Sequence, residues 1–383
     1  MRRILVLVSA IVCFETMLYT VLAPLLPEYS DRFGLSVAEA GLLSGAYAAG
    51  ALAAAVPSGL LAARIGVKAT ALAGLALLAA ASVVFGLAPD FASVFAARVA
   101  QGCGCALAWT GGLAWLVANV PIERRGQVIG AALSAALAGA LLGPAVGALA
   151  GITGPGRVFV GLAVPAFALA LWGAALPGGP PQLISLGTFR EALAARSLVM
   201  PALLIALAGF LLGVVSVLAP LRLAGLGWGA PAIAALFLLI AAAQAVLSPA
   251  VGRWSDRRGR LAPVRVGLIA SSVGSLALAS SLGRWAYPAI VLPAGVAFGL
   301  LWTPGMAMLS DGTAELGISL AAGFALMNLA WPPGQLVGSA GGAIVAQATS
   351  NAVPYLVASG LCVAGLVVFR SRRSRLRAHP GSR

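Results

Sequence analysis

The sequence predicts an all-α membrane protein of twelve transmembrane helices, arranged as two six-helix repeats of the same orientation. Three observations lead to this prediction: the apolar composition, the spacing of the hydrophobic runs, and similarities between the two halves of the chain. Of the 383 residues, 61% are hydrophobic and only 9% are charged, and the mean hydropathy is +1.02. Soluble domains carry about a quarter charged residues, so this composition excludes a soluble globular fold.

Hydrophobic runs of bilayer length recur along the whole chain. A helix crosses the hydrocarbon core with about 20 apolar residues, so twelve crossings leave only short loops and tails. We therefore expect no separate soluble domain. The expected spans cover residues 4–26, 40–61, 69–87, 91–115, 128–150, 158–176, 198–221, 232–251, 262–282, 286–309, 318–346 and 353–369.

The distribution of positive charge predicts the orientation of these spans. With an inside N-terminus, 19 of the 24 Lys and Arg residues fall in inner loops and tails. This asymmetry is the positive-inside rule, which predicts cytoplasmic N- and C-termini. The net charge of +14 thus has a membrane explanation, and we expect no nucleic-acid partner. The preference for arginine, alanine and glycine indicates a GC-rich bacterial genome, and hence a multi-pass protein of the bacterial plasma (inner) membrane.

A proline-rich stretch near the middle of the chain predicts the boundary between the repeats. We expect an N-terminal six-helix bundle over residues 1–176, a cytoplasmic linker over 177–197, and a C-terminal bundle with a basic tail over 198–383. Each bundle contains a row of glycines at a spacing of four, which lets two helices approach closely. The rows, offset by 195 residues, are Gly139, Gly143, Gly147 and Gly334, Gly338, Gly342. Pro144 adds a bend that we expect to act as a pivot.

Four short motifs accompany the twelve spans. Two follow the second and eighth spans and contain Gly59, Arg64, Gly66, Lys68 and Gly252, Asp256, Arg257, Gly259, Arg260. The third and fourth lie in the fourth and fifth spans and contain Arg98, Gln101, Gly102 and Gly139, Gly143, Pro144, Gly147. Together they resemble the motifs of the major facilitator superfamily, specifically its bacterial twelve-span drug:proton antiporter branch.

This resemblance implies the major facilitator fold and a transporter that works by alternating access. It also implies a set of gating residues, namely Gly59, Arg64, Gly66, Gly143, Pro144, Gly252, Asp256, Arg257 and Gly259. The chain departs from the family at Ala63, where the first loop motif usually has an aspartate. Asp256 is then the carboxylate left to latch the two bundles together.

Two charged side chains lie deep within the predicted spans, Glu15 and Arg98. Charge inside a membrane is costly and therefore marks a functional site by default. Glu15 lies near mid-span with Tyr19 four residues later, and Arg98 has Gln101 three residues later on the same helix face. Two interpretations stay open: a proton or substrate site, or a fixed ion pair between the first and fourth spans.

Further candidates for a central cavity are polar or aromatic residues near the middle of their spans. They are Gln244, Trp302, Met306, Asn328 and Trp331. Such Trp and Met residues also serve as packing or lipid-facing residues, so that alternative stays open for each of them.

These observations predict proton-coupled efflux of small amphipathic molecules, of the drug or multidrug type. We expect no cofactor, because the chain lacks a nucleotide-binding Gly-rich loop. We also expect no enzymatic activity, because the single histidine, His379, excludes histidine-based catalytic and metal sites. The expected partners are a small-molecule substrate, protons and the lipid bilayer, with the protein acting as a monomer. Two alternatives stay open: the same fold moving a sugar, an amino acid or another metabolite, or a non-transporting membrane receptor or enzyme.

The orientation can be tested by labelling. A cysteine introduced at Gly187, in a variant whose four native cysteines are replaced, should resist a membrane-impermeant thiol reagent added to intact cells and react after lysis. Labelling of intact cells would contradict a cytoplasmic linker.

Overall fold

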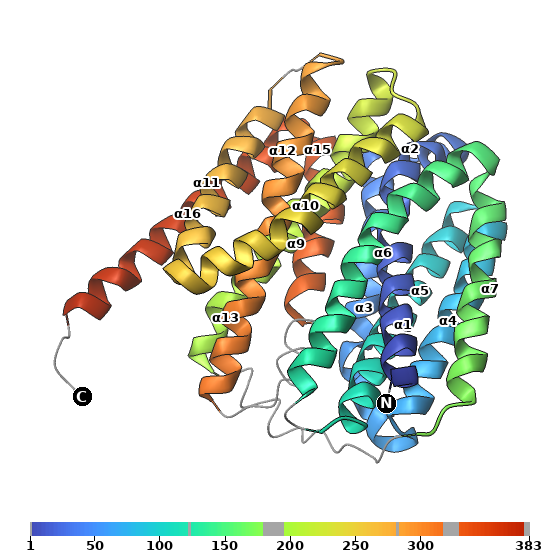
Figure 1. Cartoon of the computed structure of the whole chain (residues 1–383). Coiled ribbons are helices and arrows are strands. Elements are labelled where there is room, and N and C mark those ends of the chain that lie inside the picture. Colours follow the sequence, from blue (N-terminus) through green and yellow to red (C-terminus); the bar gives the residue numbers. More distant parts are fainter. Residues whose placement is uncertain (1, 122–123, 179–194, 281–282, 317–328, 379–383) are drawn as a thin grey trace.

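The computed structural model describes residues 2–121, 124–178, 195–280, 283–316 and 329–378. Every regular element in these ranges is a helix, so the predicted all-α fold class is confirmed. Long helices lie side by side in two sets (Figure 1). The first set consists of α1 (Arg2–Thr20), α2 (Leu22–Phe33), α3 (Val37–Ile65), α4 (Val67–Leu87), α5 (Phe91–Ala118), α6 (Arg125–Thr153) and α7 (Pro155–Ala174).

The second set follows in the same manner. It consists of α9 (Arg196–Gly225), α10 (Ala230–Arg258), α11 (Leu261–Leu278), α12 (Ala286–Leu300), α13 (Trp302–Glu315), the π-helix η2 (Val337–Gly341), α15 (Gly342–Ala348) and α16 (Ala352–Ala378). Residues 329–336 are also helical. The boundary predicted over 177–197 stays a prediction, because residues 179–194 lie outside the described ranges.

Eleven helical segments in the described residues are long and apolar enough to cross a membrane. The remaining predicted span, 318–346, lies partly outside the described residues, and its described part contains η2. Two other spans differ from the prediction because their helices are interrupted. The tenth is divided at Leu301 into α12 and α13, and the first is divided at Val21 into α1 and α2.

The first span also extends further than the sequence predicts. Pro24 has no N–H to donate to the carbonyl of Thr20, which accounts for the interruption beside Val21. Helical backbone then continues past residue 26 to Phe33, and Gly34 ends it in the left-handed conformation with φ of 61°. The charged residues expected in an outer loop, Glu28, Asp31 and Arg32, therefore lie on α2.

The next helix begins at once, with a capping box. The Ser36 hydroxyl accepts a hydrogen bond from the backbone N–H of Glu39, and the Glu39 carboxylate accepts one from the backbone N–H of Ser36. The connection between α2 and α3 is thus a short, defined turn rather than a loop.

The two glycine rows pack in the same way in both sets. A Cβ added at Gly139, Gly143 or Gly147 of α6 would meet the backbone of α1 and the following turn at Cys13, Met17 and Val21. A Cβ added at Gly334, Gly338 or Gly342 would meet α9 at Ala206, Phe210 and Val214. Each α9 partner stands 193 positions after its α1 counterpart. The repeat predicted from the sequence is therefore also a repeat of helix contacts.

The two sets contact each other where α3 begins. The amide oxygen of Gln347 accepts a hydrogen bond of 2.8 Å from the backbone N–H of Ala38. One and two turns further along α3, Gly41 and Gly45 lie directly against Ser339 of η2. The backbones approach closely here because neither glycine has a side chain.

The glycine crossing predicts a substitution effect. Gly143→Val should lower the free energy of unfolding by about 1–3 kcal/mol, because the new side chain overlaps Thr20 and the Met17 carbonyl. Gly161→Val is the matched control, since a Cβ there meets nothing within 4 Å. Thermal unfolding in detergent measures both; equal losses in the two variants would contradict the packing role of Gly143.

Candidate functional site

Glu15 is buried in the first set of helices, with 4% of its surface exposed. One carboxylate oxygen accepts a hydrogen bond of 2.6 Å from the hydroxyl of Tyr47 on α3. The other accepts hydrogen bonds from the indole N–H of Trp109 on α5 and, at 3.3 Å, from the hydroxyl of Thr16. All three donors are neutral, and within the described residues no basic side chain forms an ion pair with this carboxylate.

Arg98, on α5, is the second buried charge, with 1% exposure. One guanidinium nitrogen donates to the carbonyl of Leu18 and to the amide oxygen of Gln101, both at 2.9 Å. The other donates to the carbonyl of Tyr19 at 2.8 Å. Leu18 and Tyr19 form the last turn of α1, where carbonyl groups carry a partial negative charge. Arg98 therefore stabilises the end of α1.

Tyr47 lies between the two charges. The guanidinium of Arg98 stacks over the Tyr47 ring, 4.5 Å from its centroid, while the Tyr47 hydroxyl donates to Glu15. Arg98 and Glu15 thus form no ion pair; an aromatic ring links them instead. Of the two interpretations left open by the sequence, the fixed ion pair is not what the structure contains.

Tyr47 and Trp109 are not predicted from the sequence. Tyr47 is the only aromatic residue of α3, which is otherwise rich in alanine and glycine, and this isolation is the signal that could have found it. The glycine of the fourth-span motif, Gly102, is explained by the contact between α5 and Tyr47. A Cβ at Gly102 would overlap the Tyr47 carbonyl, so this glycine lets α5 lie close enough to α3 for Arg98 to reach the Tyr47 ring.

Aromatic residues of both sets lie beside this network. The Tyr19 and Tyr47 rings lie 5.5 Å apart, and the Trp331 indole, from the second set, interacts with the Tyr19 hydroxyl. Trp302 packs perpendicular to Trp331 at 4.7 Å between ring centroids. These contacts connect Tyr19, Trp331 and Trp302 in a row to Tyr47, which donates to Glu15.

Other predicted cavity residues have different positions. The amide of Gln244 donates to the carbonyl of Gly295 at 2.8 Å, which ties α10 to α12 within the second set. Met306 is half-buried and packs against the apolar core. Gln101, predicted beside Arg98, is fully buried there and also donates to Ser82 at 3.2 Å. Asn328 lies outside the described residues.

The two loop motifs form equivalent turns. Gly66, between α3 and α4, has φ of 89°, and Gly259, between α10 and α11, has φ of 83°. Both values lie in the region that favours glycine, which explains this residue in each motif. Gly59 and Gly252 lie one to two turns before these connections, and a Cβ at Gly59 would meet nothing within 4 Å. Arg64 is exposed at the end of α3.

Asp256 is engaged within its own set of helices. Arg260 donates to Asp256 and also forms a two-point bridge to Asp311 on α13, with distances of 2.7 and 3.2 Å. Asp311 was not singled out from the sequence. The neighbouring Arg257 is exposed. A latch from Asp256 to the first set thus stays a prediction, since this structure holds Asp256 on Arg260.

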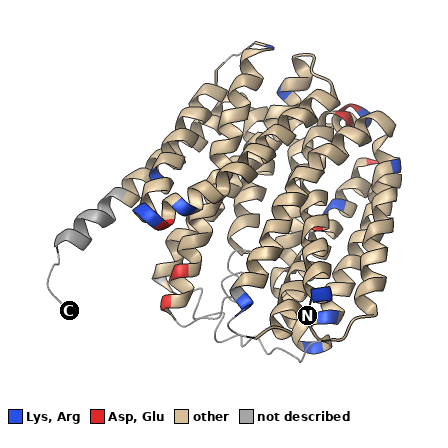
Figure 2. Cartoon of the chain, viewed as in Figure 1, with Lys and Arg blue, Asp and Glu red and all other residues tan. Residues whose placement is uncertain are grey.

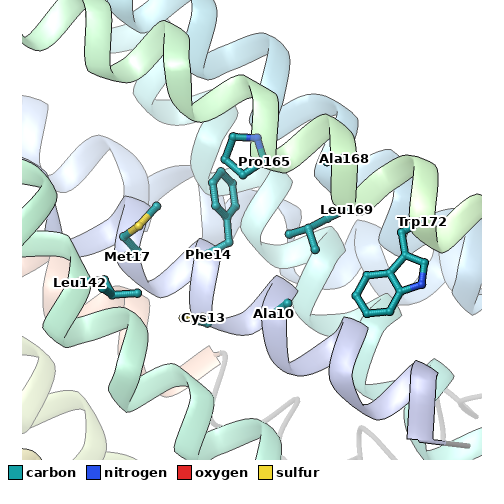
Figure 3. A pocket seen from close by; sticks show the side chains of 9 residues that line it. All are labelled: Ala10, Cys13, Phe14, Met17, Leu142, Pro165, Ala168, Leu169 and Trp172. Atoms are coloured by element: carbon teal, nitrogen blue, oxygen red, sulfur yellow. The ribbon is translucent and has the colours of Figure 1, made fainter.

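A separate apolar hollow lies between α1, α6 and α7 (Figure 3). Its volume is about 390 Å³, and its lining consists of Ala10, Cys13, Phe14, Met17, Leu142, Pro165, Ala168, Leu169 and Trp172. None of the predicted site residues lines it. Leu142 and Trp172 are exposed, so the hollow opens on the membrane-facing surface rather than towards Glu15.

The sequence profile of the Major Facilitator Superfamily matches residues 8–331 and, in a second alignment, residues 202–383. The chain belongs to the major facilitator superfamily. It is a multi-pass membrane transporter rather than an enzyme, and members of this superfamily carry small molecules, often with protons. The second alignment shows that the C-terminal part matches the profile without the first half.

Curated relatives match only part of the chain. A probable vesicular acetylcholine transporter-B of Danio rerio is 30% identical over 141 residues, which are 34% of this chain and 29% of that protein. The vesicular acetylcholine transporter of Rattus norvegicus is 43% identical over 63 residues, 16% of this chain and 12% of that protein. The chain therefore matches less than a third of the length of either relative.

Solved structures share the fold over nearly the whole chain. A crystal structure of a D-xylose-proton symporter has a TM-score of 0.76 at 17% identity, covering 96% of both chains. A bacterial homologue of the human lysosomal transporter Spinster, inward-facing and unoccupied, has a TM-score of 0.77 at 16% identity, covering 99% of this chain and 98% of that one. At this identity the likeness establishes the fold alone.

The position of Arg98 predicts a graded loss of stability. Arg98→Ala should lower the free energy of unfolding by about 2–4 kcal/mol, because buried carbonyl groups lose their donors. Arg98→Lys keeps the charge but lacks the planar fork that spans the acceptors, so its loss should be smaller.

Thermal unfolding in detergent, with Arg64→Ala as an exposed control, tests this order. If Arg98→Ala were no less stable than Arg64→Ala, the assignment of Arg98 to the end of α1 would be wrong.

Proposed function

We propose that this transporter exports a small amphipathic molecule in exchange for protons, and that Glu15 carries the proton. The observation behind this proposal is the environment of Glu15, a buried carboxylate whose hydrogen-bond donors are all neutral. A buried carboxylate without a protein cation favours neutralisation from outside, either by a proton or by a positively charged cargo. Glu15 is suited to exchange for that reason.

We propose a small organic cation as the cargo. Tyr47 and Trp109 contact the carboxylate directly, and Tyr19 and Trp331 extend the aromatic surface to the second set. Aromatic faces attract organic cations, especially quaternary ammonium groups, and a carboxylate adds the opposite charge. The curated relatives named for acetylcholine, itself a small organic cation, support the same class of cargo.

Exchange then follows from competition for one charge. When the cargo cation binds Glu15, the proton leaves; when a proton binds, the cargo leaves, and the two never occupy the carboxylate together. Alternation of the two six-helix bundles around this site would deliver proton and cargo to opposite sides of the membrane. We further propose, from the charge distribution in the sequence, a bacterial inner-membrane protein of the drug:proton antiporter branch, monomeric and with cytoplasmic termini.

Glu15→Gln tests the proposal, because it fixes the neutral form of the side chain. In proteoliposomes with an imposed pH gradient, the wild type should accumulate the organic cations ethidium or acetylcholine against their gradient. Glu15→Gln should lose this uphill transport, down to the level of protein-free vesicles, and keep some downhill flux.

Asp31→Asn is the control, since it removes an exposed carboxylate from α2 and should transport as the wild type does. Undiminished, ΔpH-dependent accumulation by Glu15→Gln would show that a group other than Glu15 carries the proton.

A further inference from the structure

The C-terminal end of α10 carries a basic hollow that the transport site does not use. Its volume is about 470 Å³, and it is lined by Ala250, Arg253, Trp254, Arg257 and Arg258. The three arginines are exposed, and Figure 2 shows positive charge gathered at this end of the helix. The hollow thus presents several guanidinium groups within two turns of one helix.

These arginines lack acidic partners in the described part of the chain. The nearest carboxylate in sequence, Asp256, accepts a hydrogen bond from Arg260, which also binds Asp311. The ion pairs formed by described residues at this end of α10 all involve Arg260, and none involves Arg253, Arg257 or Arg258. An anion that enters the hollow would therefore meet positive charge that the protein itself does not neutralise.

The face of α10 that leads to the hollow is apolar and exposed. Leu239, Val246 and Leu247 have 57%, 75% and 41% of their surface exposed, as expected for side chains that contact lipid. Counted at 3.6 residues per turn, Leu239, Val246, Ala250, Arg253 and Arg257 lie on one helix face. The apolar stripe thus runs directly into the arginines, at the point where α10 ends.

We propose that this hollow binds the phosphate of an anionic phospholipid whose acyl chains lie along the apolar stripe of α10. Guanidinium groups bind phosphate through paired hydrogen bonds. Trp254, half-buried in the lining, is typical of residues at the depth of lipid headgroups. The continuous stripe selects a lipid over a free phosphate ion, because only a lipid covers the apolar side chains and the arginines together.

Lipid-dependent stabilisation of the purified full-length protein tests the proposal. Phosphatidylglycerol added to detergent micelles should raise the thermal unfolding temperature of the wild type, and phosphatidylcholine should not. The double variant R253Q/R258Q should bind phosphatidylglycerol roughly 30-fold more weakly, since each arginine near the membrane surface contributes about 1 kcal/mol. R2Q/R3Q removes the same charge from exposed positions on α1 and is the matched control, which should bind as the wild type does.

Three results would overturn the proposal. They are equal weakening in the two double variants, which indicates unspecific attraction; unchanged binding in R253Q/R258Q; and equal stabilisation of the wild type by inorganic phosphate, which indicates a site for free anions. If R253Q/R258Q does not fold, the single variants R253Q and R258Q replace it, and each should weaken binding by roughly fivefold.

Discussion

The site depends on the acceptors that surround the guanidinium of Arg98. A charge inside a helical bundle is costly unless the protein itself solvates it. Here the last turn of α1, the Gln101 amide and the face of Tyr47 do so. Because these groups belong to α1, α5 and α3, one side chain fixes three helices relative to one another. The same arrangement aims the Tyr47 hydroxyl at Glu15 and leaves that carboxylate without a cation.

The interruption of the first span belongs to this arrangement. An unbroken helix would bond the carbonyls of Leu18 and Tyr19 along its own axis, whereas the end of α1 beside Val21 offers them to Arg98. Pro24, which causes the interruption, and Arg98, which uses it, lie more than seventy positions apart in the chain. The interrupted end of α1 thus binds a side chain of α5.

The two halves share their packing but not their polar chemistry. Positions 193 residues after Glu15, Tyr47 and Arg98 hold Ala208, Ile240 and Val291, all buried and apolar. Glycine rows make the same close helix crossing in both halves, since that crossing depends only on small side chains. The network of Glu15, Tyr47 and Arg98 thus has no polar counterpart at these equivalent positions of the second half.

The sequence by itself determined the fold class, the superfamily and the identity of the two buried charges. The fold class and the buried charges follow from hydropathy and from the cost of charge in lipid, and the superfamily follows from the resemblance of its short motifs, all of which are properties of single segments. The sequence did not predict the partners of Glu15 and Arg98, because Tyr47 and Trp109 come from other helices. The approach of those helices depends on Gly102, where α5 meets α3. Likewise, the sequence singled out Asp256 but not Asp311, which only the packing of α13 places beside Arg260. Contacts between helices depend on crossing angle and depth, and only the tertiary structure sets these.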